Sequence, residues 1–205
     1  MKTIAIIPAR GGSKRLPEKN ILGFGGIPLI AHSILYAKAN SSRIDEIYVT
    51  TDSLAIKNIA LQYGAQVIDR PTALSGDTEP TVTALKQVLE VLDDSQIENV
   101  VLLQPTNPLR PVSLLHDCFE TFQKKDCDSL FTVSQSHQKL GKISNHRFVP
   151  FNYEIGQRSQ DLDPLFFENG LLYITKASLV LNNTIISEKA FPYEVNHIFA
   201  TVDID

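Results

Sequence analysis

The sequence lacks any apolar run long enough to cross a membrane, which takes about 20 consecutive residues. Its N-terminal apolar run ends at Pro8-Ala9-Arg10 and is also too short for a signal peptide. Repeats and low-complexity tracts are absent as well. We therefore expect no membrane partner and a single domain over residues 1–205.

Cysteine is scarce, with Cys118 and Cys127 as the 2 examples in the chain. Their spacing matches no metal-ligand pattern, and nothing suggests a disulfide framework. Cys118 falls on the apolar face of an expected helix, which favours a buried thiol. Thiols that are not paired are typical of a reducing compartment, so we expect a cytoplasmic protein.

Positive charge is also limited. The 19 Lys and Arg residues are outnumbered by 23 Asp and Glu residues, and the formal net charge is -4 at pH 7. This balance argues against nucleic-acid binding through a basic surface. It does not argue against a small anionic ligand, because a local cluster of cations can bind phosphate on an acidic protein.

Short apolar runs alternate with helical patterns as far as about residue 133. Strands are expected at 4–7, 47–50, 67–68, 100–103, 130–133 and 171–174, and helices from Pro28, at 53–63, over 82–92 and over 114–122. Residues favoured at helix starts precede three helices, namely Pro28, Asp52 or Ser53, and Asp77 or Thr78. The alternation predicts an α/β fold with a mainly parallel sheet, helices on both faces, and ligands at the carboxyl ends of the strands.

The alternation stops in segment 136–166, which is polar and irregular. A structureless stretch of this length is unusual inside a compact domain. We interpret it as an inserted hairpin or arm that either covers the site or reaches a partner subunit.

A glycine-containing basic loop, Pro8 to Asn20, directly follows the first strand. Gly11 and Gly12 allow the backbone to approach a ligand and to aim N–H groups at phosphate oxygens. The loop carries four cations that could compensate a triphosphate, and a solvated basic turn is the alternative interpretation. It is neither a Walker loop nor a dinucleotide fingerprint. The cations are Arg10, Lys14, Arg15 and Lys19.

Three further segments place polar residues where ligands bind in such folds. Segment 69–81 follows a strand and opens a helix, and taken alone it favours a helix cap with a surface arginine, Arg70. Gln104 and Thr106 offer uncharged hydrogen-bonding groups after a central strand. Asp203 and Asp205 would point the same way on a strand and could meet one hard cation. Asp52, after the second strand, could join these two aspartates or cap its helix, and we favour the capping role.

Six ordered segments together resemble the CMP-sialic acid synthetases, also called acylneuraminate cytidylyltransferases. They are PARGGSKRLPEKN at 8–20, TTD at 50–52, RP at 70–71 with a following DT, LLQPTNPLR at 102–110, ENGLLYI at 168–174 and DID at 203–205. The resemblance implies a Rossmann-like fold with an extended dimerisation element. It also implies a homodimer that makes a precursor for cell-surface polysaccharides. The implied reaction joins CMP from CTP to the anomeric hydroxyl of an acidic nine-carbon sugar, releasing pyrophosphate with the help of Mg²⁺.

The resemblance also implies roles for individual residues. The nucleotide would be bound by Arg10, Gly11, Gly12, Ser13, Lys14, Lys19, Asn20, Arg70 and Thr81. The sugar would be bound by Gln104, Thr106, Arg158, Asn169 and Tyr173. Mg²⁺ would be held by Asp203 and Asp205, and the catalytic set would be Arg10, Lys19, Asp203 and Asp205.

The chain departs from the family pattern in three places. Arg158-Ser159-Gln160-Asp161 stands where the family shows Arg-Gln-Asp, so Arg158 would reach the sugar carboxylate from one position earlier. Either Lys139 or Lys142 could match the family's lysine near the sugar. The family continues into a helix after DID, whereas this sequence ends there.

Several alternatives stay open at this point. The sugar could be N-acetylneuraminate, legionaminate or pseudaminate, although LLQPTNPLR is closer to the sialate and legionaminate types. A nucleotidyltransferase for the eight-carbon acid Kdo is a second alternative, and its first loop would be expected to lack GGSK. A catalytically weak nucleotide-binding homologue is a third.

Overall fold

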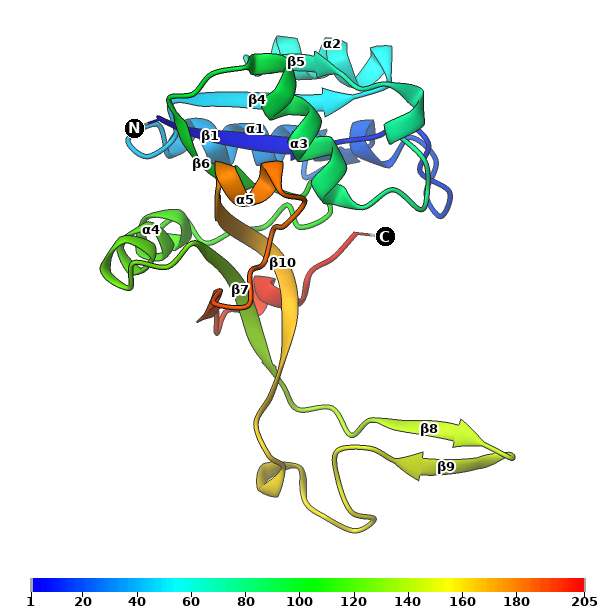
Figure 1. Ribbon diagram of the computed structural model, residues 1–205. Helices are drawn as coiled ribbons and strands as arrows, with labels where there is room; N and C mark the ends of the chain where they lie inside the picture. The colour runs from blue at the N-terminus through cyan, green and yellow to red at the C-terminus, as the bar shows by residue number, and fades with distance from the viewer. Residues whose placement is uncertain (1, 205) are drawn as a thin grey trace.

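The computed structural model describes residues 2–204 and has a seven-stranded sheet at its centre (Figure 1). The strand order is β11-β7-β10-β6-β1-β4-β5. β10 is antiparallel to both neighbours, and the other described pairings in this sheet are parallel. The predicted α/β class is confirmed. The strands are β1 (Lys2–Pro8), β4 (Glu46–Thr51), β5 (Gln66–Asp69), β6 (Ile97–Leu102), β7 (Ser129–Ser136), β10 (Leu165–Lys176) and β11 (Phe191–Glu194).

Helices cover both faces of the sheet, as expected. On one face lie α1 (Leu29–Ala39), α2 (Leu54–Gln62) and α4 (Leu114–Lys124), and on the other lie α3 (Thr81–Leu92) and α5 (Ala177–Leu181). Alternate side chains of β1 supply both cores, because successive residues of a strand point to opposite faces. Ile4 and Ile6 pack against the α3 side, and Ala5 and Ile7 pack against the α1 side.

The remaining elements are short. β2 (Gly23–Phe24) and β3 (Ile27–Pro28) form a small hairpin before α1, and four 3₁₀ turns link larger elements. The turns are η1 (Lys19–Ile21), η2 (Thr72–Leu74), η3 (Ser159–Asp161) and η4 (Ile198–Thr201). No helix within residues 2–204 combines the length and the apolarity that a membrane crossing requires.

Two of the expected helix caps are wrong. Ser53 caps α2, with its hydroxyl accepting from the Ile56 N–H, whereas Asp52 turns away toward the basic loop. The residue before α3 is Pro80, which offers no side-chain cap. Asp77 is instead drawn to cations, as described below.

Segment 136–166 contains a hairpin of β8 (Gly141–Ser144) and β9 (Arg147–Pro150). It stands at the end of the long strands β7 and β10, away from the helical layers (Figure 1). Asn145 and His146 form its two-residue turn, with φ of 49° and 60°. Such a turn matches the twist of the paired strands. We call residues 137–164 the arm.

A bulge interrupts β10 at Asn169–Leu172. On β7, Val133 pairs with Glu168 and Phe131 pairs with Tyr173, so β10 carries extra residues between these pairs. Gly170 lies in the bulge with φ of 73°, a conformation that favours glycine. Residues five apart on a regular strand point to opposite faces, but the bulge brings Glu168 and Tyr173 into contact.

Candidate active site

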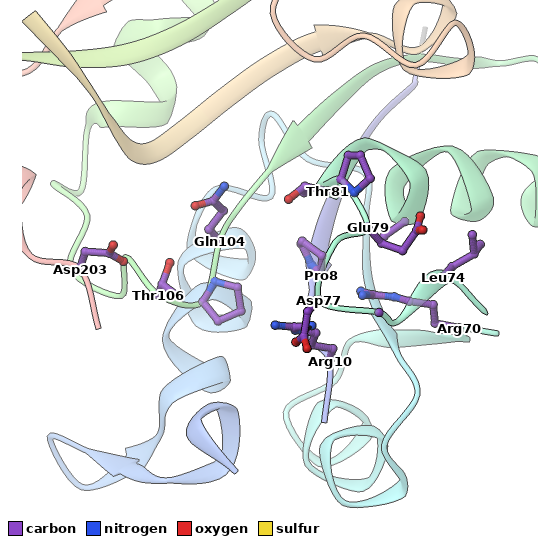
Figure 2. Close-up of a pocket in the computed structure, with 14 residues that line it drawn as sticks. Pro8, Arg10, Arg70, Leu74, Asp77, Glu79, Thr81, Gln104, Thr106 and Asp203 are labelled. Carbon is purple, nitrogen blue, oxygen red and sulfur yellow. Dashed lines mark ion pairs between the residues drawn. The ribbon is translucent and has the colours of Figure 1, made fainter. Parts of the chain in front are cut away.

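A cleft of about 370 Å³ opens at the carboxyl ends of the parallel strands, where the fold predicts a ligand site (Figure 2). It lies between the end of β1, the start of α3, the turn after β6 and the C-terminal segment. Six of the residues assigned from sequence line it together: Arg10, Arg70, Thr81, Gln104, Thr106 and Asp203.

Two cations of the basic loop hold an anion within the protein itself. The Arg10 guanidinium lies 2.7 Å from one carboxylate oxygen of Asp77, and the Lys14 ammonium pairs with the other oxygen. Figure 2 shows Arg10 and Asp77 meeting at the cleft. Hydrogen bonds from Lys14 and Arg10 lower the pKa of Asp77. The pair Arg10 and Lys14 can therefore grip an oxyanion in this geometry.

Arg70 is buried, contrary to the surface position favoured by its segment alone. Its Nη2 donates to the Thr50 carbonyl at 2.7 Å, and its Nε donates to the Thr50 hydroxyl at 3.2 Å. Burial lowers the pKa of the guanidinium. Arg70 thus lines the cleft as a rigid cation anchored to the end of β4.

The two glycines of the loop differ in their roles. The Gly11 N–H donates to Asp52 at 2.8 Å, so it is directed at a carboxylate of the protein and not at open space where a phosphate would lie. A Cβ at Gly11 would lie 2.9 Å from the Cβ of Ser53, which requires glycine there. Gly12 has no atoms within 4 Å of such a position, and the Ser13 N–H bonds back to the Gly11 carbonyl.

The end of the basic loop joins the cleft to the C-terminal segment. Lys19 is buried, and its Nζ donates to the Ile204 carbonyl at 2.8 Å. Asn20 is also buried, and its amide donates to the Arg10 carbonyl at 3.0 Å. Lys19 thus connects the basic loop to the residue next to Asp203, and Arg10 and Asp203 line the same cleft.

A second cavity of about 290 Å³ adjoins the cleft and shares Thr81 and Gln104 with it. Its walls include Tyr173 and Glu168. The Tyr173 hydroxyl donates to the Glu168 carboxylate, and burial together with this bond raises the pKa of Tyr173. Tyr173 and Gln104 thus line the same cavity.

Asn169 lies elsewhere, inside the bulge of β10. Its side-chain oxygen accepts from the Thr132 hydroxyl at 2.6 Å, and its amide donates to the Ser134 hydroxyl at 3.0 Å. The side chain is buried and lines neither cavity. In this structure Asn169 braces β10 against β7.

The basic residues assigned from the arm lie outside the cleft. Arg158 pairs with Asp161, with Nε 2.8 Å from a carboxylate oxygen, and its side chain is 70% exposed. Lys139 donates to the Gln157 carbonyl, and Lys142 lies exposed on β8. None of the three lines the cleft of its own chain.

Of the two aspartates assigned to metal, Asp203 lines the cleft and Asp205 lies outside the described residues. Within residues 2–204 no group of three or more His, Cys, Asp or Glu residues could hold a metal ion. Mg²⁺ is commonly bound through one or two carboxylates and substrate phosphates. The carboxylate of Asp203 lines a cleft that also contains the cations Arg10 and Arg70, and this fits that chemistry.

Three residues important to the site were not found from sequence. Asp77 is brought to Arg10 by the loop before α3, and Glu168 by the bulge, so neither contact has a sequence pattern. Arg110 is buried, and its guanidinium donates to the Leu171 and Gln104 carbonyls at 2.6 and 2.7 Å. Arg110 is the last residue of LLQPTNPLR, and its place in that segment could have marked it as a residue of the site.

The chain is similar to known cytidylyltransferases. The profile of the family described as Cytidylyltransferase matches residues 4–197. N-acylneuraminate cytidylyltransferase of Streptococcus agalactiae serotype III (strain NEM316) is 33% identical over 213 residues, covering 100% of this chain and 51% of the relative. CMP-N,N'-diacetyllegionaminic acid synthase of Legionella pneumophila (strain Philadelphia 1) is 34% identical, covering 100% of this chain and 91% of the relative.

Among solved structures, a CMP:2-keto-3-deoxy-manno-octonic acid synthetase complexed with CTP superposes with a TM-score of 0.72. It is 17% identical, and the match covers 95% of this chain and 90% of that one. At this identity the likeness shows a shared fold. The chain spans about half the length of the streptococcal relatives it matches.

Proposed function

This chain belongs to the cytidylyltransferase family, and on that basis we propose that it transfers CMP from CTP to the anomeric hydroxyl of a sialic-acid-type sugar. The observation that carries the proposal is the cleft that is lined by Asp203 and in which Arg10 and Lys14 grip the Asp77 carboxylate. A triphosphate and a divalent cation need both kinds of group in one cleft.

The chemistry follows from where charge develops. The sugar oxygen forms a bond to the α-phosphorus as the bond to pyrophosphate breaks, so negative charge accumulates on the leaving pyrophosphate. Arg10 and Lys14 would release the Asp77 carboxylate and bind the phosphate oxygens in its place. Buried Arg70, fixed by Thr50, would contribute a positive charge without reorganisation.

Mg²⁺ would be held by Asp203 with Asp205, and when bound it would neutralise charge on the phosphates. The protein's own part is to keep the Asp203 carboxylate on the cleft wall. Lys19 contributes by binding the backbone carbonyl of Ile204, next in sequence. This assigns Lys19 a role in holding the C-terminal segment as well as a positive charge near the phosphates.

The sugar would occupy the cavity that adjoins the cleft, beside Gln104 and Tyr173. Two relatives are named for acidic nine-carbon sugars, an N-acylneuraminate and a diacetyllegionaminate. We therefore favour a nonulosonate over the eight-carbon Kdo type. The cytoplasmic location and a role in cell-surface polysaccharide synthesis remain predictions.

We further propose that the active form is a homodimer built through the arm. The arm exposes large apolar side chains, and its Arg158 pairs with Asp161 and does not line the cleft of its own chain. In a dimer, Arg158 would reach the sugar carboxylate in the cleft of a second copy. The exposed apolar residues of the arm are Leu140, Ile143, Phe148, Val149, Phe151 and Ile155.

Pyrophosphate release from CTP tests the function directly. The purified chain is incubated with CTP and, separately, N-acetylneuraminate, N,N'-diacetyllegionaminate, pseudaminate or Kdo, each with Mg²⁺ or with EDTA. We expect Mg²⁺-dependent release with a nonulosonate and little with Kdo. Release with Kdo alone would favour the eight-carbon alternative, and CTP binding without any release would favour the catalytically weak homologue.

A further inference from the structure

Asn107, in the turn after β6, is 3% exposed and uses its whole amide group. Its Nδ2 donates to two backbone carbonyls, that of Asn169 at 3.1 Å and that of Val202 at 3.2 Å. Its Oδ1 accepts from the Thr106 hydroxyl at 3.1 Å. One side chain therefore ties the C-terminal segment to the bulge of β10.

The C-terminal segment around Asp203 belongs to no strand, so isolated contacts must fix it. The Ile204 N–H donates to the Thr106 carbonyl at 2.9 Å, and Lys19 binds the Ile204 carbonyl. Asn107 holds the other side of Asp203, through Val202. The bonds to Val202 and Ile204 thus flank the residue that faces the cleft.

The bulge gives Asn107 both its space and its rigidity. A Cβ on Gly170 would lie 2.7 Å from Asn107 Oδ1, so the glycine leaves room for the amide. The Asn169 carbonyl that Asn107 binds belongs to a residue locked to β7 through Thr132. An amide with two N–H donors suits this place, because a hydroxyl could donate to one of the two carbonyls at a time.

We propose that Asn107 is a positioning residue that holds the Asp203 carboxylate in the cleft for a divalent cation bound with CTP. It touches neither substrate nor metal in this role and acts through the backbone of Val202. The inference rests on the proposed function, because it needs Asp203 to be a ligand of the cation. It adds a residue that the family resemblance did not assign.

The test compares Asn107→Ala and Asn107→Ser with the full-length chain. Mn²⁺ binding is measured by electron paramagnetic resonance in the presence of saturating CTP and without sugar, so that no turnover occurs. CTP binding is measured separately by calorimetry in EDTA. We expect Asn107→Ala to raise the Kd for Mn²⁺ about tenfold, as loss of a buried hydrogen-bond donor suggests. The Kd for CTP in EDTA should change less than about twofold.

Asn40→Ala is the matched control. Asn40 is likewise buried and donates its Nδ2 to a backbone carbonyl, that of Tyr36 at 2.9 Å, but it lies at the end of α1. It should lose stability without any change in Mn²⁺ affinity. Amide exchange at Ile204, followed by NMR, should accelerate in Asn107→Ala and stay normal in Asn40→Ala. Asn107→Ser keeps one donor and should fold even if the alanine variant does not. Its Kd for Mn²⁺ should lie between those of Asn107→Ala and the wild type.

Wild-type Mn²⁺ affinity in the Asn107 variants would overturn the proposal, as would an equal loss in Asn40→Ala. An equal loss of CTP affinity in EDTA would also overturn it, because the whole cleft would then be disturbed. If the wild type bound CTP and Mn²⁺ but the variants matched it, this role alone would fail. If the wild type bound neither, the proposed function would fail as well.

Discussion

At the scale of single residues, the Asp77 carboxylate and a triphosphate would compete for the same two cations. Asp77 occupies both Arg10 and Lys14, the cations that we assign to the triphosphate. A nucleotide must displace this carboxylate before it can be gripped. The same contact keeps two long cationic side chains in place while the cleft holds no nucleotide.

Arg10→Ala should lower turnover about 100- to 1000-fold, because a fixed donor aimed at developing charge is lost. Pyrophosphate release under saturating CTP and sugar measures the effect. Stability should change by less than about 1 kcal/mol, since the ion pair that Arg10 forms is partly exposed and screened by solvent. Arg43→Ala removes a comparable pair, with Glu120 on α4, and should leave turnover unchanged. Near-normal turnover of Arg10→Ala would refute its assigned role.

Asp77→Asn should tighten CTP binding about two- to fivefold, because the competing charge is removed from Arg10 and Lys14. Calorimetry of CTP binding measures the change. Glu79→Gln is the control, since it removes the same charge from the same cleft wall without touching the Arg10 pair. Weaker CTP binding in Asp77→Asn would mean that Asp77 contacts the nucleotide or its metal directly.

Tyrosine burial predicts a loss of stability in alkali. Burial raises the pKa of Tyr36 from 10.0 to about 12. The neutral hydroxyl is favoured in the folded state, so this contribution is complete below pH 10 and is lost as the pH rises toward 12. The loss should reach about 2–3 kcal/mol. Urea unfolding at pH 8, 10 and 11.5 measures it.

Tyr36→Phe provides the comparison for that experiment. The variant loses the bond from the Leu115 N–H, so it should be less stable at pH 8 by about 1 kcal/mol. Its stability should then fall less steeply above pH 10. Some dependence will remain, because the pKa of Tyr48 is also raised to about 12. Parallel pH profiles for the two proteins would contradict the assignment.

The cleft residues that could be predicted are those that follow strand ends. Arg10, Arg70 and Gln104 each come directly or nearly directly after a short apolar run, and parallel strands bring such ends to one edge. Asp77 could not be predicted as their partner, because its sequence context reads equally well as a helix cap. Asp77 pairs with two cations and does not cap α3, although its sequence position favours a cap.

At the scale of elements, the bulge in β10 shapes the cavity that we assign to the sugar. It brings Glu168 and Tyr173 together against the alternation of a regular strand, so sequence periodicity could not have placed Glu168 there. The strand itself was predicted only from its apolar half, 171–174. β11 and α5 were missed, since β11 contains Pro192 and α5 has 5 residues.

Gly170→Ala should destabilise the protein by about 1–3 kcal/mol, because φ of 73° is strained for alanine and the new Cβ meets Asn107. Urea unfolding measures the loss. Gly26→Ala separates the two causes, since Gly26 has φ of 90° and nothing within 4 Å of a Cβ. It should show the backbone strain alone. Equal losses in the two variants would mean that the contact with Asn107 has no energetic weight.

At the scale of the whole molecule, the arm is the feature that a single chain does not explain. Ile143 and Phe148 pair across the β8–β9 hairpin and are 83% and 51% exposed. Large apolar side chains gathered on a projecting hairpin are typical of an interface. The arm could be predicted from the sequence, because the alternation of strands and helices stops there. The direction in which it projects from the sheet could not be predicted.

Ile143→Glu should shift the protein from dimer to monomer, because a carboxylate would be buried against apolar surface. Sedimentation velocity at micromolar concentration measures the change. Leu54→Glu is the control, since Leu54 is 71% exposed on α2, away from the arm. A wild-type protein that sediments as a monomer at all concentrations would rule out the proposed homodimer.

The bulge also determines how the arm can be presented to anything outside the molecule. Side chains alternate along a strand, so removing one residue from Asn169–Leu172 would turn every residue before it, down to Leu165, to the reverse face. The surface offered at the base of the arm would be inverted. The geometry of an assembly would then depend on the same four residues that bring Glu168 and Tyr173 together. Changes of length in this protein family should therefore collect in 137–164 and avoid the bulge.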